Sequence, residues 1–295
     1  MPRRRRGRPS AASVKDISYA SGELTEVVFA YNDMTGWNFS GKNLTNADFW
    51  SATLSGADFS GANLTDAIFN GATLAGANFS GATILGGNFV GTTFGGFTQE
   101  QFESTASYIS GELAGVILYS NIMTGWNFAS KNLTDVNFMY PVLSSADFSS
   151  ATLSGANLKS TVLTDADFTG ATLTNADLTS VDARGATGMA YTQAANTTNF
   201  IRPDRRVAGL NVGASELFFL RDYDGLDTND DGTPDTPLGI TVGDGFSVND
   251  TGRLFVYLED GDWGSTVAFD TGIPVDFDGT LQVSLIGGYS PTFGE

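Results

Sequence analysis

The sequence predicts an all-β protein built from stacked coils, and three observations carry this prediction. A bulky apolar residue recurs every five positions over two long stretches, alanine often stands two positions before it, and Gly, Ser, Thr, Asn and Asp fill the places between. A helical face would repeat every three or four residues and a strand every two, so neither explains a period of five. The backbone must instead turn a corner every five residues. Four such sides close a coil of about 20 residues, and neighbouring coils lie about 4.8 Å apart.

Two series of apolar residues define these coils, and we expect every member to point inward. The first series runs from Leu24 to Phe94 and the second from Leu113 to Leu178. Residues 20 apart share a side of the coil, so large rings in alternate sides are expected to stack in two opposite columns. These columns are Phe39, Phe59 and Phe79, and Phe49, Phe69 and Phe89. Trp50, one position after an inward residue, is expected to point outward.

A longer phrase is also repeated. The segments "SYASGEL" (18–24) and "MTGWNF" (34–39) return as "SYISGEL" (107–113) and "MTGWNF" (123–128), 89 residues later. In both copies a Val (Val27 and Val116) and then an Asn (Asn32 and Asn121) stand two positions before the inward residue, where most other units have a small residue. We interpret each copy as an opening coil that covers an open end, because a solenoid end exposes unpaired strand edges. The chain is then expected to contain two coil blocks.

The segment between the two blocks predicts a short helix. Thr98 stands three residues before Gln101, the spacing of a capping box at a helix start. We expect this helix to cover the last coil of the first block. The predicted organisation is a basic arm at 1–16, expected to be disordered, a first repeat block at 17–94, a helical spacer at 95–112, a second repeat block at 113–187, a connector at 188–206 and an all-β region at 207–295.

The five-residue pattern A-(D/N)-(L/F)-(S/T)-(G/x), as in "ADFSGANLTD" (57–66), resembles the pentapeptide-repeat family. The resemblance covers residues 22–94 and 111–183. It implies a right-handed quadrilateral parallel β-helix, in which the central Leu or Phe and the small residue two before it point inward. Some members of this family resemble duplex DNA in size and acidity and inhibit DNA gyrase.

The last third of the chain has a different pattern. Residues 201–295 hold 17 acidic and 5 basic residues, whereas residues 1–200 hold 16 and 10, so most of the net charge of −18 lies at the end of the chain. Short apolar runs such as "RLFVYLED" (253–260), separated by Gly, Asp and Pro, predict an all-β region. It is either a sandwich or a less regular continuation of the solenoid.

An acidic loop in this region resembles EF-hand-like and thrombospondin-type calcium loops. Calcium takes six to eight oxygen ligands, and a Gly at the sixth place permits the sharp turn. The twelfth place holds Leu238 instead of a bidentate acid, so a solvated acidic turn is the alternative. The candidate ligands are Asp227, Asn229, Asp231, Thr233 (through its carbonyl) and Asp235.

Composition excludes several kinds of chemistry. The chain has no cysteine and no histidine, which removes thiolate metal sites, histidine-bound metals and Cys-His or Ser-His nucleophiles. Carboxylates such as Asp48 and Asp58 recur at a position that Asn also occupies, which favours a backbone-bonding role at the corners. We therefore expect no catalytic residue and no cofactor other than the calcium considered above.

The function that fits best is that of a non-enzymatic structural or interaction protein, a rigid solenoid that presents a polar surface to a protein or a surface polymer. Export to a bacterial surface is favoured because the chain is poor in lysine and rich in Asp-Gly loops. A cytoplasmic location is the alternative, because no signal peptide is evident. No stretch is long enough to span a membrane. End-to-end self-association is compatible with the fold, and no nucleic acid is expected as a partner. The other functions considered are a DNA-mimicking inhibitor or protector of DNA gyrase and a polysaccharide-acting β-helix enzyme.

Overall fold

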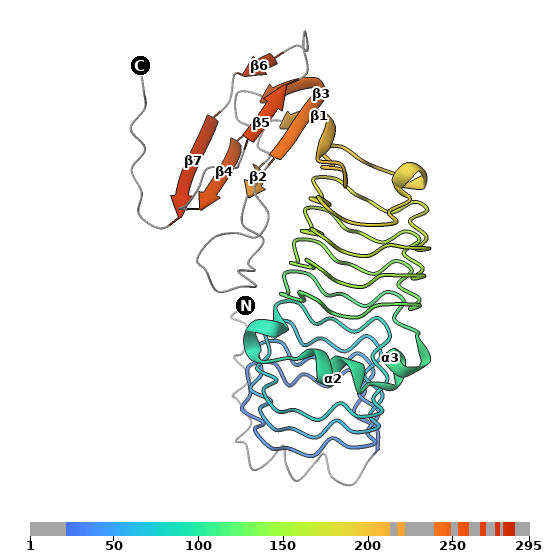
Figure 1. Ribbon diagram of the computed structural model, residues 1–295. Coiled ribbons are helices and arrows are strands. Elements are labelled where there is room, and N and C mark those ends of the chain that lie inside the picture. The colour runs from blue at the N-terminus through green and yellow to red at the C-terminus, as the bar shows by residue number, and fades with distance from the viewer. Residues whose placement is uncertain are drawn as a thin grey trace, which may run out of the picture. The chain divides into compact units, whose positions relative to one another are not determined.

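The computed structural model describes residues 22–212 and six later segments: 217–221, 239–248, 253–259, 266–269, 275–277 and 280–286 (Figure 1). The chain divides into two compact units. The first comprises Met1–Ile122 with Ser130–Phe138, and the second comprises Met123–Ala129 with Met139–Glu295.

The first unit is a stack of coils in which residues 20 positions apart lie side by side. On one side, for example, Asp48 forms parallel bridges with Val28 and with Ile68. The amide of Phe49 donates to the carbonyl oxygen of Ile68 at 2.7 Å, and most inward residues of this unit repeat this bond to the following coil. The backbone groups are thus satisfied between coils, as in a parallel sheet.

The four sides of the coil are named here after their first inward residue, in chain order. They are the Leu24 side, the Phe29 side, the Met34 side and the Phe39 side.

Within residues 22–205 each side is held by single bridges, and no strand forms there. Two of every five residues form a turn, and the second of them usually has a positive φ, such as 57° at Asn46 and 64° at Gly56. A corner every five residues leaves too few extended residues for a regular strand. Gly and Asn are frequent at the corner because they tolerate this left-handed conformation.

The expected interior is confirmed for the Phe columns. Phe39, Phe59 and Phe79 stack in sequence with ring centroids 5.1 Å apart, and Phe59 is completely buried. Phe49 and Phe69 form the second column at 4.9 Å. The rings of the two columns meet edge to face at about 5.5 Å, a favourable arrangement for aromatic pairs.

Phe94 is an exception, and its predicted inward position is wrong. Its side chain is 73% exposed. The chain makes a 3-10 turn, η1 (Thr92–Gly95), which buries Thr92 instead and turns Phe94 outward. The next place in the Phe89 column is taken by Phe97, whose ring stacks on Phe89 with centroids 5.1 Å apart.

The predicted helical segment is present as two short helices, α2 (Gln99–Glu103) and α3 (Ala106–Ser110), which lie beside the coils (Figure 1). The capping box is confirmed: the Gln101 amide donates to the Thr98 hydroxyl, and the Gln101 side chain accepts from the Thr98 amide at 2.8 Å. The Gln101 side-chain amide also donates to the carbonyl oxygens of Leu74 and Ala77 at 2.8 and 2.7 Å. These bonds tie α2 to the preceding coil.

The helices do not end the stack, so the expectation that they cover the last coil of the first block is wrong. Asn88 forms a parallel bridge with Ile117, and the amide of Gly91 donates to the carbonyl oxygen of Tyr119 at 3.1 Å. The bridged residues are 29 positions apart instead of 20, so nine additional residues are accommodated in a single coil. Four coils of 20 residues plus these nine account for the 89-residue distance between the repeated phrases.

The second opening coil lies inside the stack, contrary to the interpretation that it covers an end. Asn121 is only 2% exposed, and its side-chain amide donates to the carbonyl oxygens of Phe89 and Leu118 at 2.8 and 3.0 Å. Asn32, at the same place in the first copy, is half-buried and donates to the carbonyl oxygen of Phe29 at 3.1 Å. The same asparagine is thus accommodated in a half-buried and in a buried position, because its side-chain amide donates to a carbonyl oxygen of its own turn in both copies.

We expect Gly95→Ala to destabilise the first unit by about 1–3 kcal/mol, because the added methyl group would collide with the backbone of the preceding coil. It would overlap the carbonyl oxygen of Ala72 and lie 3.0 Å from the Cα of Thr73. Urea unfolding of the full chain measures the effect. Gly22→Ala is the control, because nothing lies within 4 Å of its added methyl group. Equal midpoints for the two variants would contradict the tight packing at Gly95.

The second unit repeats the same coil. Val162 is bridged to Val142 and to Asp182, and Phe148 stacks on Phe128 and Phe168 at 5.1 and 4.9 Å. Part of the segment predicted as a connector continues these coils: a 3-10 turn, η2 (Tyr191–Gln193), is followed by bridges from Asn196 to Asp177 and from Ile201 to Asp182, each spanning 19 residues.

In the described segments of the last third, the strands are β1 (Arg206–Val212), β2 (Leu217–Arg221), β3 (Gly239–Val248), β4 (Arg253–Glu259), β5 (Thr266–Phe269), β6 (Val275–Phe277) and β7 (Thr280–Ile286). They pair into two parallel sheets. The first has the order β1-β3-β5, with β6 also paired to β3, and the second has the order β2-β4-β7. Pairing is parallel throughout, with partners 35 apart at Arg206–Thr241 and 27 apart at Arg253–Thr280. Sandwiches are usually antiparallel, so this pattern favours the less regular continuation of the solenoid.

Candidate interaction surfaces

The outward Asp and Asn side chains fold back onto the corners that follow them. The amide of Ser60 donates to the Asp58 carboxylate at 2.9 Å, and the amide of Ser40 donates to the Asn38 side chain at 2.8 Å. Asp and Asn interchange here because either supplies the oxygen that this turn requires. The predicted corner role is confirmed. The same bond is made by Asp48, Asn63, Asn78, Asn88, Asn127, Asp147, Asn157, Asp167 and Asp177.

Side chains also bond from one coil to the next. The Asn43 side-chain amide donates to the Glu23 carboxylate at 2.7 Å, and that of Asn63 donates to the Asn43 side-chain oxygen at 3.3 Å. Asn78 donates to Asp58 at 3.1 Å in the same way. The outer amides and carboxylates are therefore held in fixed rows.

Two of the corner carboxylates have lowered pKa values. The Thr35 hydroxyl and then the Thr35 amide lower the pKa of Asp33, and the Thr169 hydroxyl and then the Thr169 amide lower the pKa of Asp167. These bonds favour the charged form.

We expect stability to fall in acid for this reason. A carboxylate whose folded pKa lies below its unfolded value of about 3.9 contributes stability that is fully present above that value and is lost as the pH falls through the folded pKa. Thermal unfolding should therefore change little between pH 7 and 5 and drop below about pH 4. Asp33→Asn with Asp167→Asn should reduce that drop, because asparagine keeps the oxygen but does not titrate. An unchanged drop would rule out these two groups.

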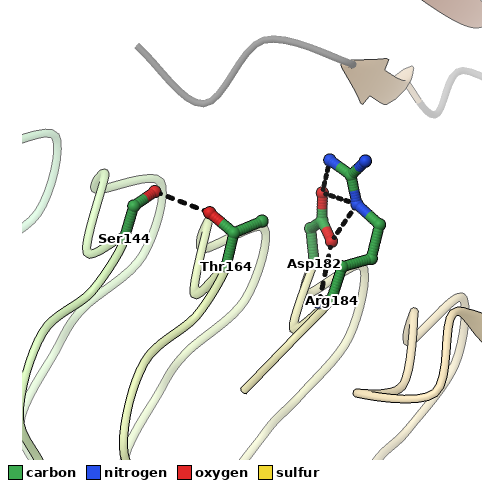
Figure 2. Close-up of polar contacts among 4 residues, drawn as sticks. All are labelled: Ser144, Thr164, Asp182 and Arg184. Carbon is green, nitrogen blue, oxygen red and sulfur yellow. Dashed lines mark hydrogen bonds and ion pairs between the residues drawn. The ribbon is translucent and has the colours of Figure 1, made fainter. Parts of the chain in front are cut away.

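The second unit contains a buried outward column, shown in Figure 2. Ser144, Thr164 and Arg184 occupy the same outward position in successive coils, and each is at most 1% exposed. The Thr164 hydroxyl donates to the Ser144 hydroxyl at 2.8 Å. At the matching position of the first unit, Thr35 and Ala75 are exposed.

Arg184 is held by the carboxylate of Asp182 (Figure 2). Its Nε lies 2.9 and 3.1 Å from the two carboxylate oxygens, and its Nη2 lies 2.7 Å from Oδ2. A forked pair of this kind is among the stronger charge-assisted contacts. The Nε–Nη2 edge of the Arg184 guanidinium is thus occupied by Asp182, which lies on the same side of the coil. We therefore assign the pair a structural role.

The sequence pattern did not single out this pair. The relevant signal is the segment Asp-Ala-Arg at 182–184, in which the small Ala183 is the buried inward residue. The residues before and after an inward residue both point outward, so the two charged side chains must be neighbours.

The Phe29 side of the first unit differs from these polar surfaces. Trp50 points outward as predicted, with 48% of its surface exposed, and its ring lies 5.8 Å from that of Tyr31. The outward residues of this side form the Phe29 face, whose large apolar members are Val28, Tyr31, Trp50, Ile68, Val90, Ile117 and Tyr119.

The predicted calcium ligands Asp227, Asn229, Asp231, Thr233 and Asp235 lie outside the described residues, so the calcium loop stays a prediction. In the part of the chain that the structure describes, no three acidic residues lie close enough to hold a metal ion. The same part has no helix long and apolar enough to cross a membrane.

These features define a class of protein in which short repeats form stacked coils. The family model described as "Pentapeptide repeats" matches in eight copies, at residues 23–61, 57–96, 142–179 and 151–187. Residues 23–96 and 142–187 of the chain are pentapeptide repeats. No curated protein matches it.

Several solved pentapeptide-repeat and related structures are similar to parts of the chain. HetL from the cyanobacterium Nostoc sp. strain PCC 7120, a protein involved in regulating heterocyst differentiation, is 16% identical over 65% of this chain and 96% of its own, with a TM-score of 0.28. A trypsin-treated variant of QnrB1, a plasmid-mediated fluoroquinolone resistance protein, is 21% identical over 57% and 92%, with a TM-score of 0.30. Rfr23 from the cyanobacterium Cyanothece 51142 is 17% identical over 51% and 90%, with a TM-score of 0.20.

Proposed function

We propose that this protein is a non-enzymatic structural or interaction protein. Its coils wind as a right-handed quadrilateral β-helix and present rigid polar faces to a protein or a surface polymer. The observation that supports this most directly is the fixed row of outer side chains, in which Asp58 accepts from both Ser60 and Asn78. A surface whose polar groups are held in place loses little entropy when a partner binds.

The same bonds argue against catalysis by these carboxylates. A general acid or base must reach a substrate proton, and these carboxylates already accept bonds from their own corners. We propose no catalytic residue and no required cofactor. Calcium remains a proposal for the 227–235 loop, and calorimetric titration with millimolar calcium tests it: absence of heat and an unchanged melting temperature would end it.

For location we propose export to a bacterial surface, with the cytoplasm as the alternative. The low lysine content and the Asp-Gly loops of the last third support the first of these. End-to-end association through the last coil is a further proposal of the same kind.

Photo-crosslinking in the producing cells tests the proposed function. A photoreactive amino acid placed at Thr73 and at Asn78, exposed positions on two different sides, is expected to give a discrete adduct from at least one of them. Absence of an adduct at both positions, and at matching exposed positions on the remaining sides, would contradict an interaction role.

A DNA gyrase supercoiling assay tests the alternative. Inhibition of supercoiling by the full chain, or protection of gyrase against a fluoroquinolone, would replace the proposed function with DNA mimicry. We expect neither, because such mimicry needs a continuous acidic field, and residues 28–31, 48–51, 68–71, 88–91 and 117–120 of the Phe29 side in the first unit carry one charged residue, Asp48.

A further inference from the structure

The Phe29 face concentrates exposed apolar residues in the first unit. Val28 is 69% exposed and Tyr31 is 58% exposed, beside the exposed Trp50. Ile68, Val90, Ile117 and Tyr119, in the following coils, are partly exposed. Past the corner at Gly91, Phe94 and Ile122 add two more exposed apolar side chains on the adjoining edge. Asp48, Asn70 and Asn88 are interspersed among these side chains, and exposed apolar residues gathered on one side of a molecule can mark an interaction site.

The distribution of charge distinguishes this face from its neighbours. Among residues 28–31, 48–51, 68–71, 88–91 and 117–120, Asp48 is the one charged residue. Its carboxylate already accepts the Trp50 amide at 2.9 Å. The Leu24 side, in contrast, carries the exposed acids Glu23, Glu26, Asp66, Glu112 and Asp135. The apolar residues are thus on a side with little like-charge repulsion.

We propose that the Phe29 face is the side-by-side interface of a homodimer. Two copies of a chain with a net charge of −18 repel each other, so they can approach closely only through a face that is nearly free of charge. A two-fold axis brings the same patch of both copies together, and a patch rich in apolar residues is complementary to itself. Flat faces made of parallel coils can pack like sheets, about 10 Å apart.

A neutral polysaccharide fits this face less well than a second copy does. The Tyr31 and Trp50 rings are tilted by 39° to each other, so they do not form one flat platform for a sugar ring. The remaining members are mostly aliphatic side chains, among them Val28, Ile68 and Ile117, whose burial is favoured by an apolar protein surface. The inference is independent of the partner proposed for the polar faces, and it differs from end-to-end association.

Sedimentation equilibrium of the full chain, at about 1–100 µM, tests the proposal over the range expected for a moderately stable dimer. We expect a dimer whose Kd rises at least tenfold in Trp50→Glu. Ser80→Glu, which adds the same charge at an exposed matching position on the Phe39 side, should leave the Kd unchanged. Raising the salt concentration should tighten the wild-type dimer, because salt screens the repulsion between the acidic copies.

Three results would overturn the proposal. These are a wild-type chain that stays monomeric over the whole range, a dimer that Trp50→Glu leaves intact, and a monomer that binds a soluble neutral glucan in a Trp50-dependent manner. If Trp50→Glu lowers the melting temperature, Val28→Glu replaces it. Val28 is the most exposed member of the face, so its substitution leaves the interior unchanged.

Discussion

Phe59→Asp is expected to unfold the first unit. Phe59 is completely buried, and its ring lies between those of Phe39 and Phe79 at 5.1 Å on either side. The substitution removes these contacts and places a carboxylate where nothing can solvate it. Loss of a buried Phe alone costs about 3–5 kcal/mol, and the buried charge adds to this. Natural domains are stable by only about 5–15 kcal/mol, so little stability should remain.

Far-UV circular dichroism and thermal unfolding measure this effect. The matched control is Thr73→Asp, which places the same carboxylate at an exposed bridge position that Asp occupies elsewhere, as at Asp48. We expect the control to melt like the wild type. A Phe59→Asp chain that also melts like the wild type would show that the side chain does not lie inside the coil.

Asp182→Ala is expected to destabilise the second unit by about 3–5 kcal/mol, because it removes a carboxylate that pairs with a buried guanidinium. The Arg184 side chain is 1% exposed and that of Asp182 is 16% exposed, so water cannot readily replace the lost partner. The double substitution Asp182→Ala with Arg184→Leu should recover most of this loss, since the buried guanidinium is then removed together with its carboxylate.

Urea unfolding of the two single variants and the double variant measures the coupling between these residues. If the double variant is less stable than Asp182→Ala alone, Arg184 stabilises the second unit mainly through contacts other than its pair with Asp182.

The interior of the coils could be predicted from the sequence because it depends on a local rule. Each inward residue, such as Phe59 or Phe79, is specified by its own five-residue unit, and the period fixes its side. The capping box at Thr98 is equally local and was equally predictable. Both are set by residues that lie within a few positions of each other.

The failures occur where the period and the packing disagree. Phe94 keeps the five-residue spacing, but the nine-residue insertion begins beside it, and Phe97 fills the core position instead. Asn121 is polar and was predicted to cover an end, yet it lies inside because its amide finds carbonyl partners in Phe89 and Leu118. Neither outcome depends on a local rule. Each depends on which coil lies next to the residue.

The candidate surfaces were predictable to different degrees. The outward position of Trp50 follows from the period, but the apolar character of its side becomes apparent only when residues 20 and 29 apart are placed together. The Asp182–Arg184 pair was missed because its burial is a property of the folded unit, whereas an isolated Asp-Ala-Arg segment is usually solvated.

Disulfide formation between introduced cysteines tests the stacking most directly, because the chain has none of its own. Residues bridged between neighbouring coils lie about 4.8 Å apart, within the range of about 4.4–6.8 Å between the Cα atoms of a disulfide. The pair Asn88→Cys with Ile117→Cys should therefore cross-link under mild oxidation, since these residues are bridged across the insertion. The pair Asn88→Cys with Tyr108→Cys, which an uninterrupted 20-residue coil would bring together, should not, because Tyr108 lies in α3. Preferential cross-linking of the second pair would contradict the stack of coils described here.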